Sequence, residues 1–214
     1  MIEEAAKEFY LQGYKATTMR SLASAVGIKH PSLFSLFENK SAIASVIMSK
    51  YYQGVEGSAR KFVEEHPDPV NEEEAVRLVF YAMNYILLYE DRHIAEFLTS
   101  FYDEDSEAVD RVIDSLHHLE TPEEIAGDEF TRTMYRLDTR FLGMISMMLT
   151  KELGEKAITP KVATQYFTEK VLPVRKSARP LTVEEARRYH TEHWEEIQEA
   201  VRKIDVYKDY FMED

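Results

Sequence analysis

Two short helical patterns separated by one glycine stand near the start of the chain, in residues 17–40, TTMRSLASAVGIKHPSLFSLFENK. Apolar residues of the first pattern recur at the i, i+3, i+4, i+7 spacing that places side chains on one face of a helix. They are Met19, Leu22, Ala23 and Val26. Thr17 or Thr18 can cap the first free N–H groups, and Gly27 can take the left-handed conformation that ends a helix. The pattern therefore predicts a short helix bounded at both ends.

The second pattern begins at Pro31, whose fixed φ suits a first helical turn. We expect Leu33, Leu36 and Phe37 to face inward. The residues between them that can face outward are Lys29, His30, Ser32 and Ser35. Two short helices joined by a tight turn, the second with small and basic outward residues, form the arrangement in which one helix enters the major groove of DNA.

The residues of this region resemble the TetR-type bacterial transcriptional regulators. The family pattern places a glycine before A-T-[ST]-hydrophobic-R-x-[IL]-A, followed by G-[VI] and by L-[YF]-x-x-F-x-[NS]-K. The matching residues are Gly13, Ala16, Thr17, Thr18, Met19, Arg20, Leu22, Ala23, Gly27, Ile28, Leu33, Phe34, Phe37, Asn39 and Lys40. The resemblance implies an all-α protein with an N-terminal three-helix head, residues 1–50, and a larger helical body, residues 51–214, for ligand binding and dimerisation.

Composition limits the cellular setting. A chain of 214 residues with 44% hydrophobic residues can bury a sizeable core. It contains no cysteine, so disulfides and thiolate metal sites are excluded, in agreement with a reducing compartment. The first residues, MIEEAAKEF, lack the basic and apolar regions of a signal peptide. We expect a cytoplasmic protein without a membrane partner.

The charge is distributed unevenly along the chain. Residues 1–50 hold six Lys or Arg against four Glu, a balance of +2, whereas the total is 26 against 39, a net charge of −13. The remainder therefore holds 20 against 35, a balance of −15. A mildly basic head on an acidic body would confine attraction for phosphates to one end. Acidity that serves only solubility explains the same numbers.

If residues 17–40 form a helix-turn-helix, two kinds of DNA contact are expected. We expect four residues to hold phosphates: Thr17, Thr18, Arg20 and Lys40. We expect another four to face base edges: Lys29, His30, Ser32 and Ser35. Phe34 is added from the family pattern, although it stands where tyrosine is common and so lacks a hydroxyl group. Ser21 replaces the acidic residue that often completes the cap, and the head is thinly basic, so binding should be weak or strongly dependent on salt.

The body begins with helices that carry recognisable caps. Asn39 can cap a helix with an apolar row that runs from Ile43 to Phe62, and Asn71 with Glu74 marks the start of the next helix. Residues 75–89, AVRLVFYAMNYILLY, are apolar all round and too short for a bilayer, so this helix should be buried. The resemblance places a small-molecule pocket beside it. The ligand-facing residues expected are Phe80, Met83, Asn84, Leu87, Phe97, Phe101 and Tyr135. A plain core helix is the alternative.

Later segments predict further helices and an interface. A capping signal at residues 121–124 and a methionine-rich run predict a long helix to about Glu152, with residues of the core or of a subunit interface. Thr159 with Pro160, and Thr182 with Glu185, start the last two helices. The final helix carries an apolar stripe that needs a partner, and the family forms its homodimer through late helices. Such a dimer presents two reading helices about 34 Å apart to a near-palindromic operator.

Catalytic and metal-binding patterns are weak. His190 and His193 lie three residues apart, but HTEH is not a zinc-protease motif, and we expect neither a metal nor a cofactor. The sequence therefore predicts a ligand-responsive DNA-binding regulator, a repressor released by a small and largely apolar molecule. The alternative is a helical dimer of the same type that acts as a protein-binding module with a weakened DNA-reading head. An enzyme would need a constellation that the sequence does not display.

Overall fold

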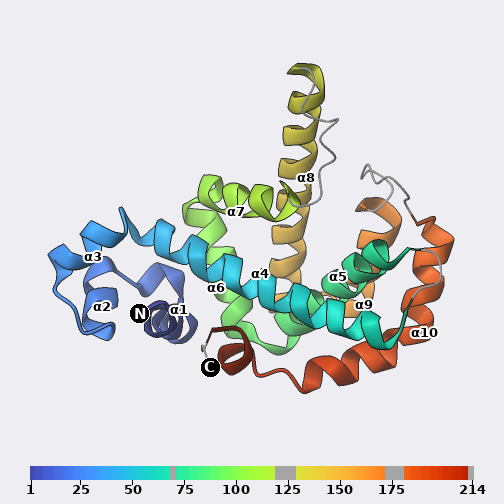
Figure 1. Cartoon of the computed structure of the whole chain (residues 1–214), viewed down its shortest axis with the longest axis horizontal. Helices are drawn as coiled ribbons and strands as arrows, with labels where there is room; N and C mark the ends of the chain where they lie inside the picture. Colours follow the sequence, from blue (N-terminus) through green and yellow to red (C-terminus); the bar gives the residue numbers. More distant parts are fainter. Residues whose placement is uncertain (68–70, 119–128, 172–180, 212–214) are drawn as a thin grey trace. The chain divides into compact units, whose positions relative to one another are not determined.

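A computed structural model describes residues 1–67, 71–118, 129–171 and 181–211, and within these ranges the chain forms helices and no strand (Figure 1). The elements are α1 (Ile2–Ala16), α2 (Met19–Ala25), α3 (His30–Leu36), α4 (Lys40–Glu65), α5 (Glu72–Glu90), α6 (Arg92–Glu104), α7 (Ser106–His118), α8 (Glu129–Gly154), α9 (Pro160–Tyr166), the π-helical turn η2 (Phe167–Val171), α10 (Val183–Arg202) and the π-helical turn η4 (Tyr207–Phe211). The predicted all-α fold is confirmed for the described residues.

The chain divides into two compact units that each combine distant segments. Of the described residues, those within 1–50 and 96–151 form the first unit, and those within 51–95 and 152–211 form the second. The first unit contains α1 to α3 with the first turns of α4, most of α6, α7 and most of α8. The second contains α5, α9 and α10 with the remainder of α4. A functional division into residues 1–50 and 51–214 stays a prediction.

The helix-turn-helix forms as its local signals predict. The Thr18 hydroxyl accepts a hydrogen bond from the backbone N–H of Ser21, and the Ser21 hydroxyl accepts one from the N–H of Thr18. Ser21 thus completes a capping box although it is not acidic. Gly27 has a φ of 73°, the left-handed conformation expected at the end of α2. Pro31 lies in the first turn of α3, where its missing N–H is not needed.

Helix α1 carries a kink near its C-terminal end. Gly13 has φ 76° and ψ 162°, so the helix is interrupted there, but a further helical turn continues to Ala16. Buried aromatic rings hold this part of α1 against α6 within the first unit. The centroid of the Phe9 ring lies 5.4 Å from that of Phe97, and the Tyr14 ring lies 4.8 Å from that of Phe101. This cluster is the local core beneath the head.

Helix α5 is the buried centre of the second unit. Nearly every residue from Glu74 to Leu88 is buried, which confirms the interpretation of the all-round apolar pattern. The Asn71 side chain accepts from the N–H of Glu74, as the capping signal predicts. Both α10 and α9 pack against α5. The stripe of α10 therefore has its partner within the chain: Ala186, Tyr189, Ile197 and Val201 are buried there without a second subunit.

One predicted feature, the capping signal at 121–124, falls outside the described residues. The Thr159 and Thr182 caps are present, since each hydroxyl accepts from the backbone N–H three residues further on. Within the described ranges, none of the helices is both long enough and apolar enough to span a membrane.

Candidate nucleic-acid interface

The outer face of α3 is a nearly continuous exposed surface. Leu33 is buried and anchors the helix, whereas six of its seven residues are exposed. These are His30, Pro31, Ser32, Phe34, Ser35 and Leu36. The prediction that Leu36 faces inward is wrong, because 59% of its surface is exposed. On a helix of only two turns a spacing of three does not decide which of two leucines is buried. The exposed apolar side chains of α3 thus lie on a surface that also carries hydroxyl and imidazole groups.

Contacts within α3 order the predicted base-facing side chains. The rings of His30 and Phe34, one helical turn apart, meet edge to face with centroids 4.8 Å apart. The Ser35 hydroxyl donates to the backbone oxygen of Ser32 over 2.7 Å, which leaves its oxygen lone pairs free to accept from a base. Phe34 therefore packs against the imidazole of His30. This contact was not predicted from the sequence.

Cationic and capping groups surround this face. Arg20, in the first turn of α2, and Lys29, at the cap of α3, are exposed. In the described part of the chain neither forms an ion pair. Thr18 is exposed at the start of α2, beside backbone N–H groups that favour an anion. Thr18 and Arg20 therefore stay predicted phosphate contacts, and Lys29, predicted to face base edges, is a further exposed cation beside them.

Thr17 has a different environment from its neighbour. Only 1% of its surface is exposed, and its hydroxyl donates to the backbone oxygen of Gly13 over 2.8 Å. This bond satisfies a carbonyl group at the point where Gly13 interrupts α1. The structure thus gives Thr17 a bracing role inside the head, and we do not carry it forward as a phosphate contact.

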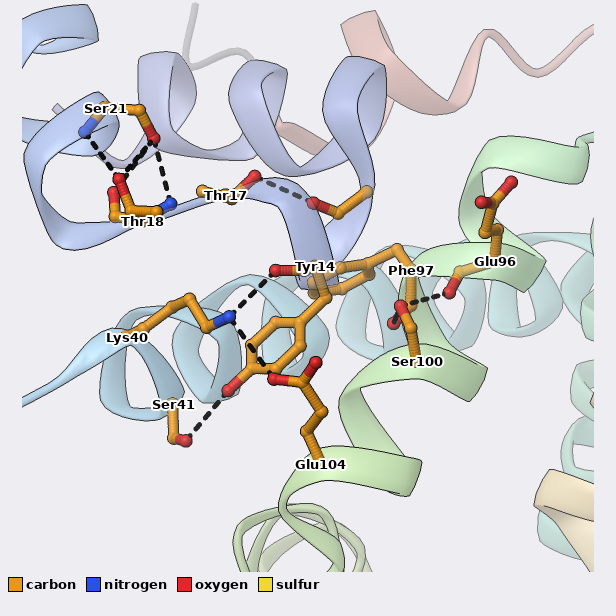
Figure 2. A network of polar contacts seen from close by, with 11 residues as sticks. Tyr14, Thr17, Thr18, Ser21, Lys40, Ser41, Glu96, Phe97, Ser100 and Glu104 are labelled. Atoms are coloured by element: carbon orange, nitrogen blue, oxygen red, sulfur yellow. Dashed lines mark hydrogen bonds and ion pairs between the residues drawn. The ribbon is translucent and has the colours of Figure 1, made fainter.

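Lys40 is held by three contacts to two residues within the first unit (Figure 2). Its ammonium group donates to the backbone oxygen of Tyr14 over 2.9 Å, lies 3.9 Å from the centroid of the Tyr14 ring, and is 3.4 Å from a carboxylate oxygen of Glu104. The Tyr14 hydroxyl in turn shares a hydrogen bond of 3.0 Å with Ser41. The ammonium therefore ties the start of α4 to the end of α1 and to the end of α6.

Sequence reasoning missed two members of this network. Glu104 lies 64 positions after Lys40, and no local pattern links them. Tyr14 follows the kink glycine, which is the only local hint that its carbonyl group needs a donor. Burial raises the pKa of the Tyr14 hydroxyl, so the group stays neutral and keeps its hydrogen bond to Ser41.

Four of the predicted ligand-facing residues lie on α5 in the second unit. Met83, Asn84 and Leu87 are buried, and Phe80 is half-buried. The amide oxygen of Asn84 already accepts a hydrogen bond of 2.9 Å from the Tyr51 hydroxyl. Next to them Tyr85, absent from the prediction, has a buried hydroxyl without a hydrogen-bond partner among the described residues. Such an unsatisfied group is the one polar feature here that a ligand would complete.

The other predicted ligand contacts belong to the first unit. Phe97 and Phe101 are buried and pack on Phe9 and Tyr14 of α1, so their observed role is to hold the head. Tyr135 lies in α8, but its side chain is outside the described residues. Only the α5 residues therefore remain for an effector proposal.

Among the described residues, no group of three or more acidic or histidine side chains has a geometry that would hold a metal ion. His193 instead pairs with Glu196, with 2.7 Å between Nδ1 and the carboxylate oxygen. His190 is buried, and burial lowers its pKa to about 4, so its imidazole is neutral at pH 7. The two histidines thus have separate environments.

Comparison with known proteins confirms the resemblance for the head. Residues 1–47 match the family described as bacterial regulatory proteins, tetR family. The match covers α1, α2, α3 and the first turns of α4. No curated protein and no solved structure matches the chain significantly. Members of the matched family are DNA-binding regulators and not enzymes, in agreement with the prediction that this protein is not an enzyme.

Proposed function

Because residues 1–47 form a TetR-type N-terminal helix-turn-helix domain in a DNA-binding transcriptional regulator, we propose that α3 reads a specific operator in the major groove. The observation that carries this proposal is the exposed face of α3, anchored only by Leu33. His30, Ser32 and Ser35 supply hydrogen-bonding groups for base edges, and Phe34 offers apolar surface to thymine methyl groups. Lys29 contacts DNA from the cap of the same helix.

We propose Arg20, Thr18 and Lys29 as the groups that fix the head on phosphates. Arg20 and Lys29 are exposed cations, and Thr18 stands at a helix start. Lys40 supports DNA binding indirectly. Its ammonium group contacts Tyr14 and Glu104 and so holds the helices of the head in position. With few free cations on this face, the salt dependence expected for each head is modest, in contrast to the strong dependence that the sequence pattern predicts as one of two outcomes.

The proposed assembly is a two-fold homodimer through α8. Exposed apolar residues recur along α8 at alternating steps of four and three: Phe130, Met134, Leu137, Phe141, Met144 and Met148. This is the 3.5-residue repeat of a coiled-coil seam, and the rise from Phe130 to Met148 is about 27 Å. A stripe that pairs with its own copy forms an isologous interface. The stripe of α10 is already buried in its own chain, which favours α8 among the late helices.

The effector proposal rests on α5. Its buried aromatic neighbours and the unsatisfied Tyr85 hydroxyl suit a largely apolar molecule with one polar group. A ligand that favours one spacing of the two reading helices would lower affinity for an operator that requires another spacing. Repression with release by such a ligand, in the cytoplasm where bacterial DNA lies, is the mode of action that we propose.

The test is titration of the protein with its own upstream DNA at two salt concentrations, with an unrelated duplex of equal length as control. We expect tighter binding to the upstream DNA and weaker binding at the higher salt concentration. Equal affinity for both duplexes under both conditions would reject the regulator proposal.

One observation favours the alternative of a protein-binding head. Phe34 and Leu36 both expose large apolar side chains on α3, and exposed apolar surface also serves protein contacts. The same titration separates the two functions, because a protein with a protein-binding head would show no preference for the upstream DNA over the unrelated duplex. A Ser32→Asp variant, which adds a negative charge to this face, should abolish DNA binding but leave the fold unchanged.

A further inference from the structure

A cleft of about 190 Å³ lies between α9 with η2 and α10, inside the second unit. It is lined by Lys161, Thr164, Gln165, Thr168, Glu169, Arg187, His190, Thr191 and Trp194. None of these residues belongs to the predicted effector site on α5 or to the DNA-reading head. The cleft is therefore a separate feature of the chain.

Two lining side chains carry buried polar atoms without a hydrogen-bond partner in the described part of the chain. They are the hydroxyl oxygen of Thr164 and the Nδ1 atom of His190. Only 2% of Thr164 and 9% of His190 is exposed. Buried polar atoms are satisfied in the great majority of cases, so two orphan atoms on residues that line one cleft indicate a missing polar partner.

Most other polar groups of the cleft are already engaged, whereas Lys161 is exposed and forms no ion pair among the described residues. Glu169 accepts from Arg187 over 2.8 Å and from Gln165 over 3.1 Å, so the charges at the mouth largely satisfy one another. The Thr168 and Thr191 hydroxyls donate to backbone oxygens within their own helices. An anionic ligand thus gains little from Arg187, which would have to leave Glu169.

We propose that this cleft binds a small uncharged ring compound with one hydroxyl group, of which phenol is the simplest probe. A hydroxyl both donates and accepts, so it can pair with the Thr164 hydroxyl and with either tautomer of a neutral imidazole. A carboxylate only accepts and would fail with the tautomer whose Nδ1 carries no proton. The indole of Trp194 and the threonine methyl groups supply apolar contacts for the ring. Because burial lowers the pKa of His190, its imidazole is neutral at pH 7.

The experiment is calorimetric titration of the full chain with phenol. We expect saturable one-site binding with a dissociation constant of about 1 mM or tighter. Thr164→Val, which keeps the shape of the side chain and removes the hydroxyl, should weaken binding about five- to tenfold. His190→Leu should weaken it to a similar degree, and His190→Asn, which keeps a polar atom near Nδ1, should restore part of the loss.

The matched control is Thr150→Val. Thr150 is also a buried helical threonine, but its hydroxyl donates to the backbone oxygen of Ser146 over 2.8 Å. This variant should bind phenol as the wild type does and unfold at a lower temperature. Thr164→Val should be at least as stable as the wild type, because it removes an unsatisfied group. Loss of phenol binding in Thr164→Val then cannot be ascribed to unfolding.

Two further probes test the chemical class. Benzoate and toluene keep the ring and replace the hydroxyl by a carboxylate or a methyl group, and both should bind more weakly than phenol. Absence of saturable phenol binding, binding that neither Thr164→Val nor His190→Leu weakens, or tighter binding of benzoate or toluene would each overturn the proposal. None of these measurements involves DNA, so failure of the operator proposal leaves this test unaffected.

Discussion

Lys40 donates a hydrogen bond of 2.9 Å to the backbone oxygen of Tyr14 and also lies above the ring of the same residue, 3.9 Å from its centroid. One side chain therefore satisfies the end of α1 and packs on the aromatic cluster that supports the head. The TetR-type pattern contains this lysine, and a phosphate contact was its predicted role. In the structure its ammonium group instead joins three helices of the first unit.

Replacement of Lys40 by methionine should lower the free energy of unfolding by about 1–2 kcal/mol, because the Tyr14 carbonyl loses its charged donor. The partly exposed ion pair with Glu104 adds little to this value. Urea unfolding measures the effect, and Glu104→Gln is the control that removes the ion pair alone. A Lys40→Met variant with wild-type stability but a reduced salt slope of DNA binding would restore the phosphate role.

Arg20→Ala and His30→Ala should affect DNA binding in different ways. Loss of the exposed Arg20 charge should weaken all sequences about equally and reduce the salt slope by about one. Loss of the His30 imidazole should change the preferred sequence at a cost of about 1–3 kcal/mol for the preferred base pair. Fluorescence anisotropy with a panel of single-base operator variants measures both. The assignment of roles is reversed if Arg20→Ala alters preference and His30→Ala does not.

Two glycines on α4 should respond oppositely to alanine. A Cβ atom at Gly54 would lie 2.4 Å from the ring of Tyr210 in η4, so Gly54→Ala must displace the ring and should destabilise the protein by about 1–3 kcal/mol. A Cβ atom at Gly57 meets nothing within 4 Å, and Gly57→Ala should stabilise the helix by about 0.5–1 kcal/mol. Thermal unfolding of the pair tests this close approach. Equal shifts of the two variants would show that Tyr210 does not pack on Gly54.

Local signals explain how much of the fold could be predicted. The Asn71 and Thr182 caps act on N–H groups three residues away, so the short sequence pattern contains the whole interaction. The left-handed Gly27 is equally local. By contrast, the carboxylate that pairs with Lys40 lies 64 positions away, and no periodicity indicates which distant carboxylate will approach it.

An apolar pattern indicates that a helix face is buried, but it does not indicate whether the same chain or a second subunit covers that face. The stripe of α10 was interpreted as a subunit interface because it needed a partner, and α5 of the same chain supplies that partner. The methionine-rich pattern of α8 agrees with either a core or a subunit interface. In the structure, the outer stripe of this helix is exposed. The unsatisfied Tyr85, Thr164 and His190 atoms could not be predicted at all, since satisfaction of a polar group depends on tertiary neighbours.

The stability of the protein should fall between pH 6.5 and 4 through His190. Its pKa is lowered from 6.5 to about 4 by burial, so in this interval the unfolded chain binds a proton that the folded chain does not. The contribution of His190 to the free energy of unfolding is fully present above pH 6.5 and decreases as the pH falls. Below pH 4 about 3 kcal/mol of it has been lost. The charged residues that line the same cleft are Lys161, Glu169 and Arg187. All three are present both in the wild type and in a His190 variant.

Comparison with His190→Asn isolates this contribution, because the carboxylates of both proteins titrate alike. The difference in free energy of unfolding between wild type and variant should change with pH between 6.5 and 4 and be constant above that range. The imidazole resonance of His190 should titrate near pH 4 by NMR. A titration midpoint near 6.5 would show that the ring is accessible to water.

Charge in the α8 stripe should separate the proposed dimer. Leu137 and Phe141 lie at the middle of the exposed repeat, one helical turn apart, so glutamate at either position would place two like charges close to a two-fold axis without a counterion. Because both side chains are exposed in the single chain, Leu137→Glu should leave its fold intact. Sedimentation velocity should therefore show a dimer for the wild type and a folded monomer for the variant, with weaker operator binding. Leu11→Glu, at an exposed apolar position on α1, is the matched control and should remain dimeric. A monomeric wild type, or a Leu137→Glu variant that stays dimeric, would exclude α8 as the interface.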